Sequence, residues 1–382
     1  MDQRGLSLRT AEETSLSLRV PGGVSTIVVE RGALASAGAR LAGEWPGARR
    51  VFVVADERVG ELHGAALDGA LRAAGLEPCR KAVPAGEGSK SLTVAAELYD
   101  WLAAQRVERG ELVLAFGGGV VGDLAGFVAA TYLRGVPLAQ APTTLLAMVD
   151  SSVGGKTGIN LPAGKNLVGA FYQPGLVLVD PGLLRTLPER ELRSGWAEVI
   201  KYALLERSVP GLEDAELLPL LEEEGRALRA LEEPLCSRVV RRCIAIKRAV
   251  VEQDERETGL RRILNLGHTV GHAIEAAAGY GRYTHGEAVA LGLRAAARLA
   301  ARRGRCDISL QDRIDALLDD LGLPARIDGC AVDDLLRRIG SDKKVRQGRV
   351  HWVLPAAPGQ VGIYSDVPTD EVRAVLEELG AA

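Results

Sequence analysis

The chain has 382 residues, of which 47% are apolar and 25% charged, and its formal net charge is −3. This composition is ordinary for a globular protein and excludes a global positive field that would attract nucleic acid or an anionic membrane. The length suits two domains at roughly 100–200 residues each.

The cellular location is predicted from the absence of membrane-spanning, signal-peptide and disulfide patterns in the sequence. No stretch approaches the ~18–20 consecutive apolar residues of a membrane span. The N-terminal residues are polar and lack the apolar core of a signal peptide. The five cysteines form no CxxC pair, which argues against a zinc knuckle or a disulfide framework. We therefore expect a cytoplasmic protein with reduced, structural thiols.

Short apolar strands alternate with amphipathic helices along the first half of the chain. Strands are expected at 25–29, 50–56, 80–83 and 111–116, and helices at 34–41, 60–74, 92–105 and 124–133. This alternation predicts an α/β domain with a mostly parallel, doubly wound, Rossmann-like sheet. In such sheets ligands bind beyond the carboxyl ends of the strands.

A glycine-rich turn, Gly117 to Asp123, joins the strand 111–116 to its helix. Glycines let the backbone approach a pyrophosphate, and a helix N-terminus offers unpaired N–H groups. The turn lacks the strict GxGxxG spacing with an acid about 20 residues later, and such a turn is as often only a tight connection. Asp56 also ends a strand, where it could accept a hydrogen bond from a ribose hydroxyl. Together these features favour a dinucleotide site.

A second loop system places Lys156, Lys165 and Asn166 among glycines and small residues. Lysine in such a loop serves as a point charge for phosphate. The alternative, a solvated surface, is weaker because the flanking sequence is apolar. Gly155 and Lys156 superficially resemble a P-loop, but the required first glycine is replaced by Asp150, which excludes that motif.

The second half of the chain is predicted to be helical. Helices are expected at 191–205, 217–231, 235–253, 288–303, 310–321, 332–339 and 369–379, with one strand at 350–354. We therefore expect two domains, an α/β domain of residues 1–185 and an all-α domain of residues 186–382.

Three of the five histidines fall within eighteen positions of this helical half, at His268, His272 and His285. If the first two lie on one helix they share a face, because positions i and i+4 are one turn apart. Histidine is the commonest metal ligand and the usual acid/base group at neutral pH, so the cluster indicates a metal or proton-transfer site. The alternative is a set of hydrogen-bonded histidines in a helix–helix interface.

Several longer runs occur in the order seen in one enzyme family. They are 116–127 (FGGGVVGDLAGF), 149–157 (VDSSVGGKT), 164–166 (GKN), 196–201 (WAEVIK), 265–272 (NLGHTVGH) and 285–287 (HGE). The chain resembles 3-dehydroquinate synthase over nearly its whole length. The resemblance implies an NAD-binding α/β domain, a helical domain that holds a divalent metal (usually zinc, with cobalt as the alternative) and a homodimer in the cytoplasm.

The resemblance also implies a metal site that differs from the simple helical pairing. It assigns the ligands to Glu198, His268 and His285, and it makes His272 a neighbouring acid/base group. One carboxylate and two imidazoles leave positions open, which suits a catalytic zinc ion. Two adjacent hydroxyls of the substrate would fill those positions.

The reaction that the resemblance implies starts from 3-deoxy-D-arabino-heptulosonate 7-phosphate, in the shikimate pathway to aromatic amino acids. NAD⁺ oxidises the C5 hydroxyl, phosphate is eliminated, and NADH reduces the ketone again. The ring then opens, and an intramolecular aldol step closes the carbocycle of 3-dehydroquinate. NAD is regenerated, so the reaction has no net redox change.

Positions matching the family give the remaining site residues. For the substrate phosphate they are Arg134, Lys156, Asn166 and one of Lys343 and Lys344. For the substrate carboxylate they are Arg261 and Asn265, and for the ring hydroxyls Asp150, Lys201 and Lys247. For NAD they are Asp56, Glu87, Lys90, Gly119, Val120, Val121, Gly122, Asp123, Thr143, Thr144, Lys156, Lys165, Leu183, Leu184, Arg185 and Thr186. Two departures, Leu161 in place of a common histidine and the variant loop 85–90, touch only the adenine side.

Other functions are compatible with parts of this pattern. The nearest is another sugar phosphate cyclase, such as an aminodehydroquinate synthase. Arg261 and Asn265 favour a substrate with a carboxylate, which disfavours inosose and valiolone synthases but leaves the amino analogue open. A metal- and NAD-dependent alcohol dehydrogenase shares the two-domain plan but would accumulate NADH. A non-catalytic relative is disfavoured by the intact metal and lysine set.

Overall fold

The structure is a computed structural model that describes residues 15–212, 214, 216–279, 281–341, 345–346 and 349–382. The described chain forms two compact units that meet in sequence between Leu187 and Pro188. The boundary lies two residues beyond the division at 185/186 that the sequence predicts.

The first unit is built on a seven-stranded sheet in the order β1-β2-β9-β6-β5-β3-β4. Only β1 runs antiparallel to its neighbour, and all other pairs are parallel. The strands are β1 (Ser15–Val20), β2 (Gly23–Val29), β3 (Arg50–Asp56), β4 (Glu77–Val83), β5 (Leu112–Gly117), β6 (Leu138–Pro142) and β9 (Leu176–Val179). The doubly wound α/β prediction is confirmed, with β1, β6 and β9 added.

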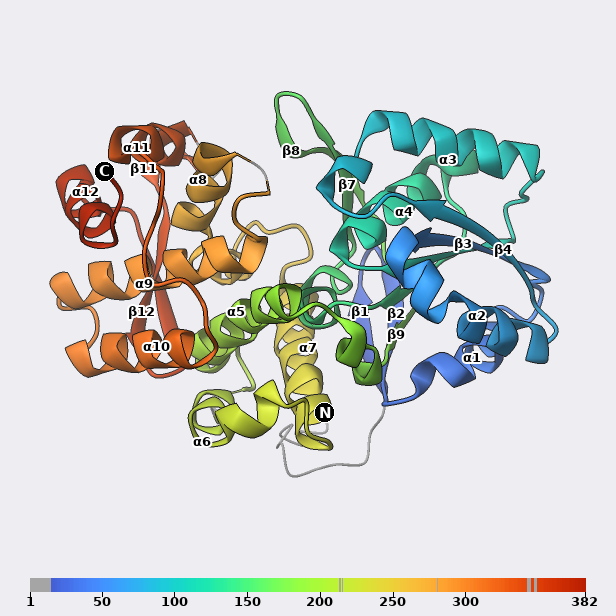
Figure 1. Cartoon of the computed structure of the whole chain (residues 1–382), viewed down its shortest axis with the longest axis horizontal. Helices are drawn as coiled ribbons and strands as arrows, with labels where there is room; N and C mark the ends of the chain where they lie inside the picture. The colour runs from blue at the N-terminus through green and yellow to red at the C-terminus, as the bar shows by residue number, and fades with distance from the viewer. Residues whose placement is uncertain (1–14, 213, 215, 280, 342–344, 347–348) are drawn as a thin grey trace. The chain divides into compact units, whose positions relative to one another are not determined.

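Helices cover both faces of this sheet, with α1 and α2 on one face and α3 and α4 on the other (Figure 1). Their bounds are α1 (Ala37–Glu44), α2 (Glu57–Ala73), α3 (Leu92–Ala104) and α4 (Gly119–Thr131). On the second face, Phe52 and Val113 of the sheet pack with Leu98 of α3 and Leu124 of α4, all 0% exposed. The central strands are continuous apolar runs because both faces of a parallel sheet are buried.

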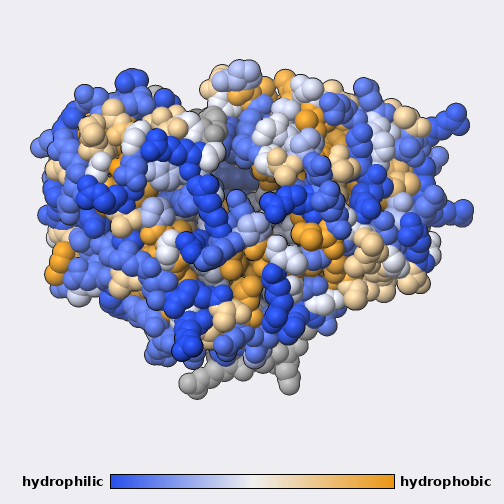
Figure 2. All heavy atoms as spheres, viewed as in Figure 1, coloured by the Kyte–Doolittle hydropathy of each residue, from blue (hydrophilic) through white to orange (hydrophobic). Residues whose placement is uncertain are grey.

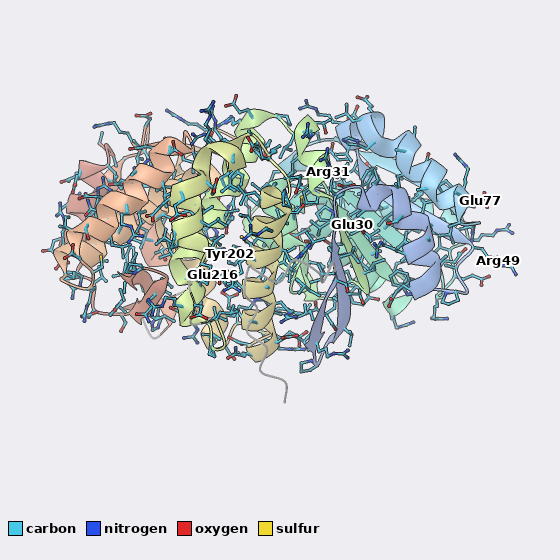
Figure 3. The ribbon with its side chains drawn as sticks, turned by 90° about the horizontal axis from the view of Figure 1, so that it is seen from below. Glu30, Arg31, Arg49, Glu77, Tyr202 and Glu216 are labelled. Atoms are coloured by element: carbon cyan, nitrogen blue, oxygen red, sulfur yellow. The ribbon has the colours of Figure 1, made fainter. Side chains whose placement is uncertain are left out.

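The parallel strands end together along one edge of the sheet. Asp56 at the end of β3 is in register with Val83 at the end of β4, and Gly117 of β5 is in register with Pro142 of β6. At the opposite edge, β3 and β4 also start together, since the N–H of Glu77 donates to the carbonyl of Arg49; both residues are labelled in Figure 3. The loops that leave the carboxyl edge therefore lie beside one another, where such sheets bind ligands.

A β-hairpin that the sequence did not predict follows β6 and a π-helical turn (Ala147–Ser151). Its strands are β7 (Lys156–Leu161) and β8 (Gly164–Phe171). A Cβ on Gly169 would lie 2.1 Å from the carbonyl oxygen of Thr157, so only glycine allows the strands to approach this closely. Glycines and lysines weaken the alternating apolar pattern of this segment, so the sequence predicts a loop here.

The second unit is largely helical, as predicted. Its helices are α5 (Glu189–Leu205), α6 (Leu217–Arg229), α7 (Leu235–Gln253), α8 (His268–Ala278), α9 (His285–Arg302), α10 (Ile308–Asp320), α11 (Val332–Ser341) and α12 (Thr369–Glu378). The unit is not all-α, because it also holds two β-hairpins. These pair β10 (Val345–Arg346) with β11 (Arg349–Val350), and β12 (Trp352–Ala357) with β13 (Gln360–Tyr364).

Glycines allow α5, α8 and α9 to pack at unusually short separation. A Cβ on Gly286 of α9 would lie 1.9 Å from the carbonyl oxygen of Ser194 in α5. A Cβ on Gly292 of α9 would lie 1.8 Å from the carbonyl oxygen of Gly267, the residue before α8. Any larger side chain would push α9 away from its neighbours. The two glycines thereby set the spacing of the three helices.

The face of the molecule drawn in Figure 2 is predominantly polar. Figure 2 shows hydrophilic residues over most of the face drawn, with apolar residues dispersed among them. Among the described residues, no helix combines the length and the apolar character that crossing a bilayer requires.

The helix spacing can be tested with Gly292→Ala. Overpacking a tight backbone contact costs about 1–3 kcal/mol, so we expect a lower melting temperature in thermal unfolding followed by circular dichroism. Gly340→Ala in α11 is the matched control, because a Cβ there meets no atom within 4 Å. Equal melting temperatures for the two variants would contradict the role of Gly292.

Candidate active site

Three potential metal ligands meet where α5, α8 and α9 pack together. Glu198 lies on α5, His268 begins α8 and His285 begins α9. One ligand atom from each lies within 4.8 Å of the others. Nε2 of His268 is 3.5 Å from Oε1 of Glu198, and Nε2 of His285 is 3.4 Å from the same oxygen. The three side chains converge on one point.

The carboxylate of Glu198 is the least satisfied group of the cluster. It is 0% exposed, and within the described part of the chain neither of its oxygens accepts a hydrogen bond of good geometry. Its Oε2 is close enough to Nζ of Lys201, one turn later on α5, to form an ion pair. This ion pair leaves Oε1, the oxygen that faces both imidazoles, without a hydrogen-bond donor, and a buried charge that is only partly satisfied is costly. Glu198, His268 and His285 therefore fit a divalent metal.

Hydrogen bonds on the far side of each imidazole orient the two histidines. Nδ1 of His268 is 3.0 Å from the carbonyl oxygen of Leu266, and Nδ1 of His285 is 3.1 Å from Oε2 of Glu275. A carbonyl oxygen only accepts, so Nδ1 of His268 carries the proton. Nε2, which faces Glu198, is then left as the ligand atom. Such partners commonly fix the tautomer of metal-binding histidines.

Sequence reasoning missed Glu275. It is 7% exposed and lies two turns after His268 on α8. A buried acid on the same helix face as a candidate ligand is a recognisable pattern, since positions i and i+7 align. Only the packing of α9 against α8 shows that its partner is His285.

The two acids around His285 strongly favour a positive charge. Burial lowers the pKa of His285, but the carboxylates of Glu198 and Glu275 outweigh that effect and raise it to about 10. The electrostatic field at this point thus favours a cation, as expected of a metal site.

A capping box fixes the position of His285. The side chain of Thr284 accepts from the N–H of Glu287, and the side chain of Glu287 accepts from the N–H of Thr284. This arrangement satisfies two backbone donors and starts α9 at His285. Arg190 holds Glu287 from α5 through bonds of 2.8 and 2.7 Å.

His272 lies beside this cluster. Its ring centroid is 5.3 Å from that of His268 and 6.1 Å from that of His285, and the residue is exposed. His272, Glu275 and His285 also have ligand atoms within 4.8 Å of one another. We favour the set that contains Glu198, because its buried carboxylate requires compensation. The helical spacing alone would have paired His268 with His272 instead.

Two predicted lysines lie buried in the same unit. Lys201 is 1% exposed on α5, and its Nζ lies 4.9 Å from the ring centroid of Tyr202, which is labelled in Figure 3. Lys247 is 6% exposed on α7. Lysines are rarely buried this completely, which makes both suitable for binding or proton transfer.

Arg261 and Asn265 lie on the connection between α7 and α8. The guanidinium of Arg261 donates to the carbonyl of Glu255, and Nδ2 of Asn265 donates to Oε1 of Glu257 at 2.7 Å. Arg261 is only 2% exposed. The Nδ2 amide of Asn265 carries two N–H donors, so it can bind a substrate carboxylate with the second while it keeps its bond to Glu257.

Asp254 organises this connection, and sequence reasoning missed it. Its carboxylate accepts from the N–H groups of Thr258, Gly259 and Arg261 at 2.9, 2.7 and 3.0 Å. Burial raises the pKa of Asp254, but these hydrogen bonds outweigh it and hold the pKa below its usual value. An acid followed closely by Thr-Gly is a turn pattern that the sequence does display.

In the first unit, most predicted cofactor residues lie at or just beyond the carboxyl ends of β3, β4, β5, β6 and β9, and Lys156 and Lys165 lie on the β7–β8 hairpin. Oδ1 of Asp56 caps α2 by accepting from the N–H groups of Arg58 and Val59. A Cβ added to Gly117 would lie only 3.2 Å from the Cβ of Asp56, so this acid is adjacent to the glycine turn. Asp56 is thus both a helix cap and a neighbour of the turn.

The glycine turn leads into α4, whose first residue is Gly119 and whose first two turns carry Val120 to Asp123. A Cβ on Gly118 would lie 3.0 Å from Cγ2 of Thr144. The hydroxyl of Thr143 is buried without a hydrogen-bond partner in the described residues. An unsatisfied hydroxyl beside a helix N-terminus fits a bound polar cofactor.

The loop after β4 contacts α4. Lys90 is 5% exposed, and its Nζ lies 2.5 Å from Oδ2 of Asp123. The segment after β9, Pro181–Thr186, contains Leu183 to Thr186 and buries Leu183 and Leu184. The hydroxyl of Thr186 also lies 2.8 Å from Nε2 of His63, within hydrogen-bond distance.

The predicted phosphate residues of this unit, Arg134, Lys156 and Asn166, are exposed. Arg134 has φ +67° and follows Leu133 at φ +49°, a strained conformation of the kind that clusters at functional sites. Tyr172 links the Arg134 turn to the neighbourhood of Lys156. Its hydroxyl donates to the carbonyl of Val136, and its N–H donates to the carbonyl of Gly155.

Asp150 lies on the π-helical turn, an irregularity frequent at functional sites. Lys165 and Asn166 lie on β8, where Asn166 has φ +55°. Lys343 and Lys344 lie outside the described residues, so the structure does not distinguish them.

Two family models match the chain, one after the other. Residues 80–194 match the family model "3-dehydroquinate synthase N-terminal", and residues 195–345 match "3-dehydroquinate synthase C-terminal". The chain belongs to the 3-dehydroquinate synthase family. A 3-dehydroquinate synthase of Symbiobacterium thermophilum is 48% identical over 92% of this chain and 97% of its own length. One of Synechocystis is 46% identical over 94% and 98%.

Solved structures extend the comparison. A 2-epi-5-epi-valiolone synthase of Streptomyces hygroscopicus subsp. jinggangensis, with NAD⁺ and Zn²⁺ bound, has a TM-score of 0.85, is 32% identical and covers 94% of this chain and 98% of its own. A glycerol dehydrogenase of Schizosaccharomyces pombe has a TM-score of 0.68 at 17% identity, covering 92% and 88%. The latter shows the shared fold alone.

The role of Glu275 can be tested by metal affinity. Loss of a partner that orients a metal-binding histidine typically weakens binding about 10–100-fold, and we expect this for Glu275→Ala. Glu275→Gln keeps an acceptor oxygen toward Nδ1 of His285 and should lose less. Competition with a chelator measures the zinc affinity. An alanine variant that binds zinc as tightly as the unaltered chain would contradict the assignment.

Asp254→Asn tests the connection between α7 and α8 by its pH dependence. Because the folded pKa of Asp254 lies below the unfolded value of about 3.9, its stabilisation is fully present above that value and is lost as the pH falls through the folded pKa. We expect the variant to lose about 1–3 kcal/mol in urea unfolding at neutral pH. The difference should shrink below about pH 4. Asp312→Asn, on the exposed side of α10, is the control; equal losses would contradict the role.

Proposed function

We propose that this protein is a 3-dehydroquinate synthase. It converts 3-deoxy-D-arabino-heptulosonate 7-phosphate into 3-dehydroquinate and phosphate, with NAD and a divalent metal as cofactors. The observation that carries the proposal is the convergence of Glu198, His268 and His285 on one buried point in a chain of this family. Zinc is the proposed metal, with cobalt as the alternative. A cytoplasmic homodimer stays a prediction.

The cofactors supply chemistry that side chains lack. When bound, NAD accepts and returns a hydride, and the divalent metal polarises a hydroxyl as a Lewis acid. Glu198, His268 and His285 would hold the metal. The glycine turn at Gly119 to Asp123 and the buried hydroxyl of Thr143 support the placement of NAD at the carboxyl edge of the sheet.

The basic residues of the chain bind the anionic substrate. Arg134, Lys156 and Asn166, with Lys343 or Lys344, would hold the phosphate and stabilise its negative charge as it leaves. Arg261 suits a carboxylate because a guanidinium can bind both of its oxygens. Lys201 and Lys247 are buried and present ammonium groups that would orient the ring hydroxyls, a task we also assign to Asp150.

His272 is the proposed acid/base residue. Its imidazole is exposed and lies beside the two proposed histidine ligands, so a ring nitrogen can exchange a proton with substrate. Histidine suits this task because its pKa lies near neutrality. Removing the imidazole should slow proton transfer without emptying the metal site.

A second substrate within the same superfamily is the strongest rival. The valiolone synthase at 32% identity supports the shared cyclase chemistry, whereas the 3-dehydroquinate synthases are 48% and 46% identical. Arg261 supports a carboxylate-bearing substrate and does not separate the dehydroquinate precursor from its amino analogue. Both are therefore included in the test.

The decisive experiment measures phosphate release from the heptulosonate phosphate, with and without NAD⁺ and chelator. We expect release that requires NAD⁺, stops with chelator and leaves no accumulated NADH. Accumulation of NADH in proportion to the substrate consumed would identify a dehydrogenase and overturn the proposal. Faster turnover of the amino analogue would assign the alternative synthase.

The separate roles of two histidines follow from their positions. We expect His268→Ala to lose bound zinc together with activity, because it removes a ligand. His272→Ala should keep its zinc and lose about 10²–10⁴-fold in kcat, as removal of an acid/base group typically does. Metal analysis and steady-state kinetics on the same samples provide the test. A fully zinc-loaded His268→Ala protein would refute the ligand assignment.

A further inference from the structure

We propose that Asn160 is a positioning residue that couples NAD binding to phosphate binding. The inference rests on the proposed function, because it takes Glu87 and Lys90 as NAD contacts and Asn166 as a phosphate contact. Asn160 itself belongs to neither set. It joins the two loops through its backbone and its side-chain amide, all within the first unit.

A bulge in the β7–β8 hairpin makes Asn160 available for this task. The pairing register shifts between Ile159, which is opposite Val168, and Leu161, which is opposite Gly164. Asn160 stands at the shift, and its N–H donates to the carbonyl of Lys90 at 2.8 Å instead of to the facing strand. Bulges commonly redirect a side chain near a functional site.

The side-chain amide completes the link in two directions. Nδ2 of Asn160 donates to Oε1 of Glu87 at 2.7 Å, and Oδ1 accepts from the N–H of Asn166 at 3.0 Å. The orientation of the amide follows from its partners, because a carboxylate only accepts and a backbone N–H only donates. One planar group thus connects the loop after β4 to β8.

The contact with Asn166 holds an unfavourable backbone conformation. Asn166 has φ +55°, a left-handed conformation that an L-residue adopts only at a cost. The hydrogen bond from its N–H to Asn160 helps to keep this conformation in place. Loss of that bond would let Asn166 and the adjoining Lys165 relax away from their bound positions.

The contact with Glu87 transmits the constraint to the other loop. Lys90, three residues later, is held through its carbonyl by Asn160 and through its ammonium by Asp123 on α4. A ligand that orders either loop therefore orders part of the other. Thermodynamic coupling is reciprocal, so NAD should tighten phosphate binding by the factor with which phosphate tightens NAD binding.

The experiment uses the full chain loaded with zinc and takes orthophosphate as the probe. We titrate NAD⁺ alone and with saturating orthophosphate, and the ratio of the two dissociation constants is the coupling. For the unaltered chain we expect a ratio of about five or more. Asn160→Ala should bring the ratio close to one and weaken each ligand roughly tenfold, the effect of losing a hydrogen bond to a charged group.

An exchange of donor and acceptor separates coupling from simple loss of structure. Asn160→Asp places a carboxylate opposite that of Glu87. Neither group can donate a hydrogen bond to the other, so this variant should lose the coupling. Glu87→Gln alone keeps a bond, since its amide oxygen accepts from Asn160. In the double variant, the new amide at position 87 can donate to the new carboxylate at position 160, whose second oxygen accepts from the N–H of Asn166. The double variant should therefore regain the coupling of Glu87→Gln.

Leu167→Ala, a change at a 42% exposed position of β8, is the control for the hairpin and should keep the coupling. A ratio near one in the unaltered chain, or an Asn160→Ala protein with the unaltered ratio, would overturn the inference while the synthase activity stands. Failure of the unaltered chain to release phosphate from the heptulosonate phosphate would instead overturn the proposed function.

Discussion

The buried carboxylate of Glu198 is the constraint on which the helical unit depends. It is 0% exposed, with Oε1 between two imidazoles and Oε2 beside Lys201. Burying this charge is costly unless a cation compensates it. Gly286 and Gly292 permit the close helix packing that brings the two imidazoles near this carboxylate. The same packing that buries the charge thereby creates the site.

In the α/β unit, the register of the parallel strands places the candidate binding loops next to one another. Parallel strands end along one edge, so loops distant in sequence leave the sheet side by side. Lys90 and Asp123 form an ion pair at this edge, and Asn160 connects Glu87 to Asn166. The unit is therefore a network of loops held by hydrogen bonds, and the proposed coupling of NAD and phosphate is a consequence of that network.

Much of the fold was predictable from local patterns. The central strands are unbroken apolar runs, and the helix starting at His285 has a capping box in its sequence. The β7–β8 hairpin was missed because glycines and lysines obscure its period. Glu275 and Asp254 were missed because each acts through partners that only folding brings near. Helical spacing alone pairs His268 with His272, because it cannot identify a ligand that lies on another helix.

The sequence by itself determined the α/β and helical halves, the family and the residue types at the site, because periodicity and motifs are local properties of a chain. Tertiary structure alone decided how close the proposed ligands lie: ligand atoms of Glu198, His268 and His285, which the family resemblance already assigns, come within 4.8 Å of one another. It also decided that Glu275 orients His285 and that a bulge turns Asn160 toward Glu87. These contacts join residues on separate elements, and their distances depend on how closely helices and strands pack, which no local pattern encodes.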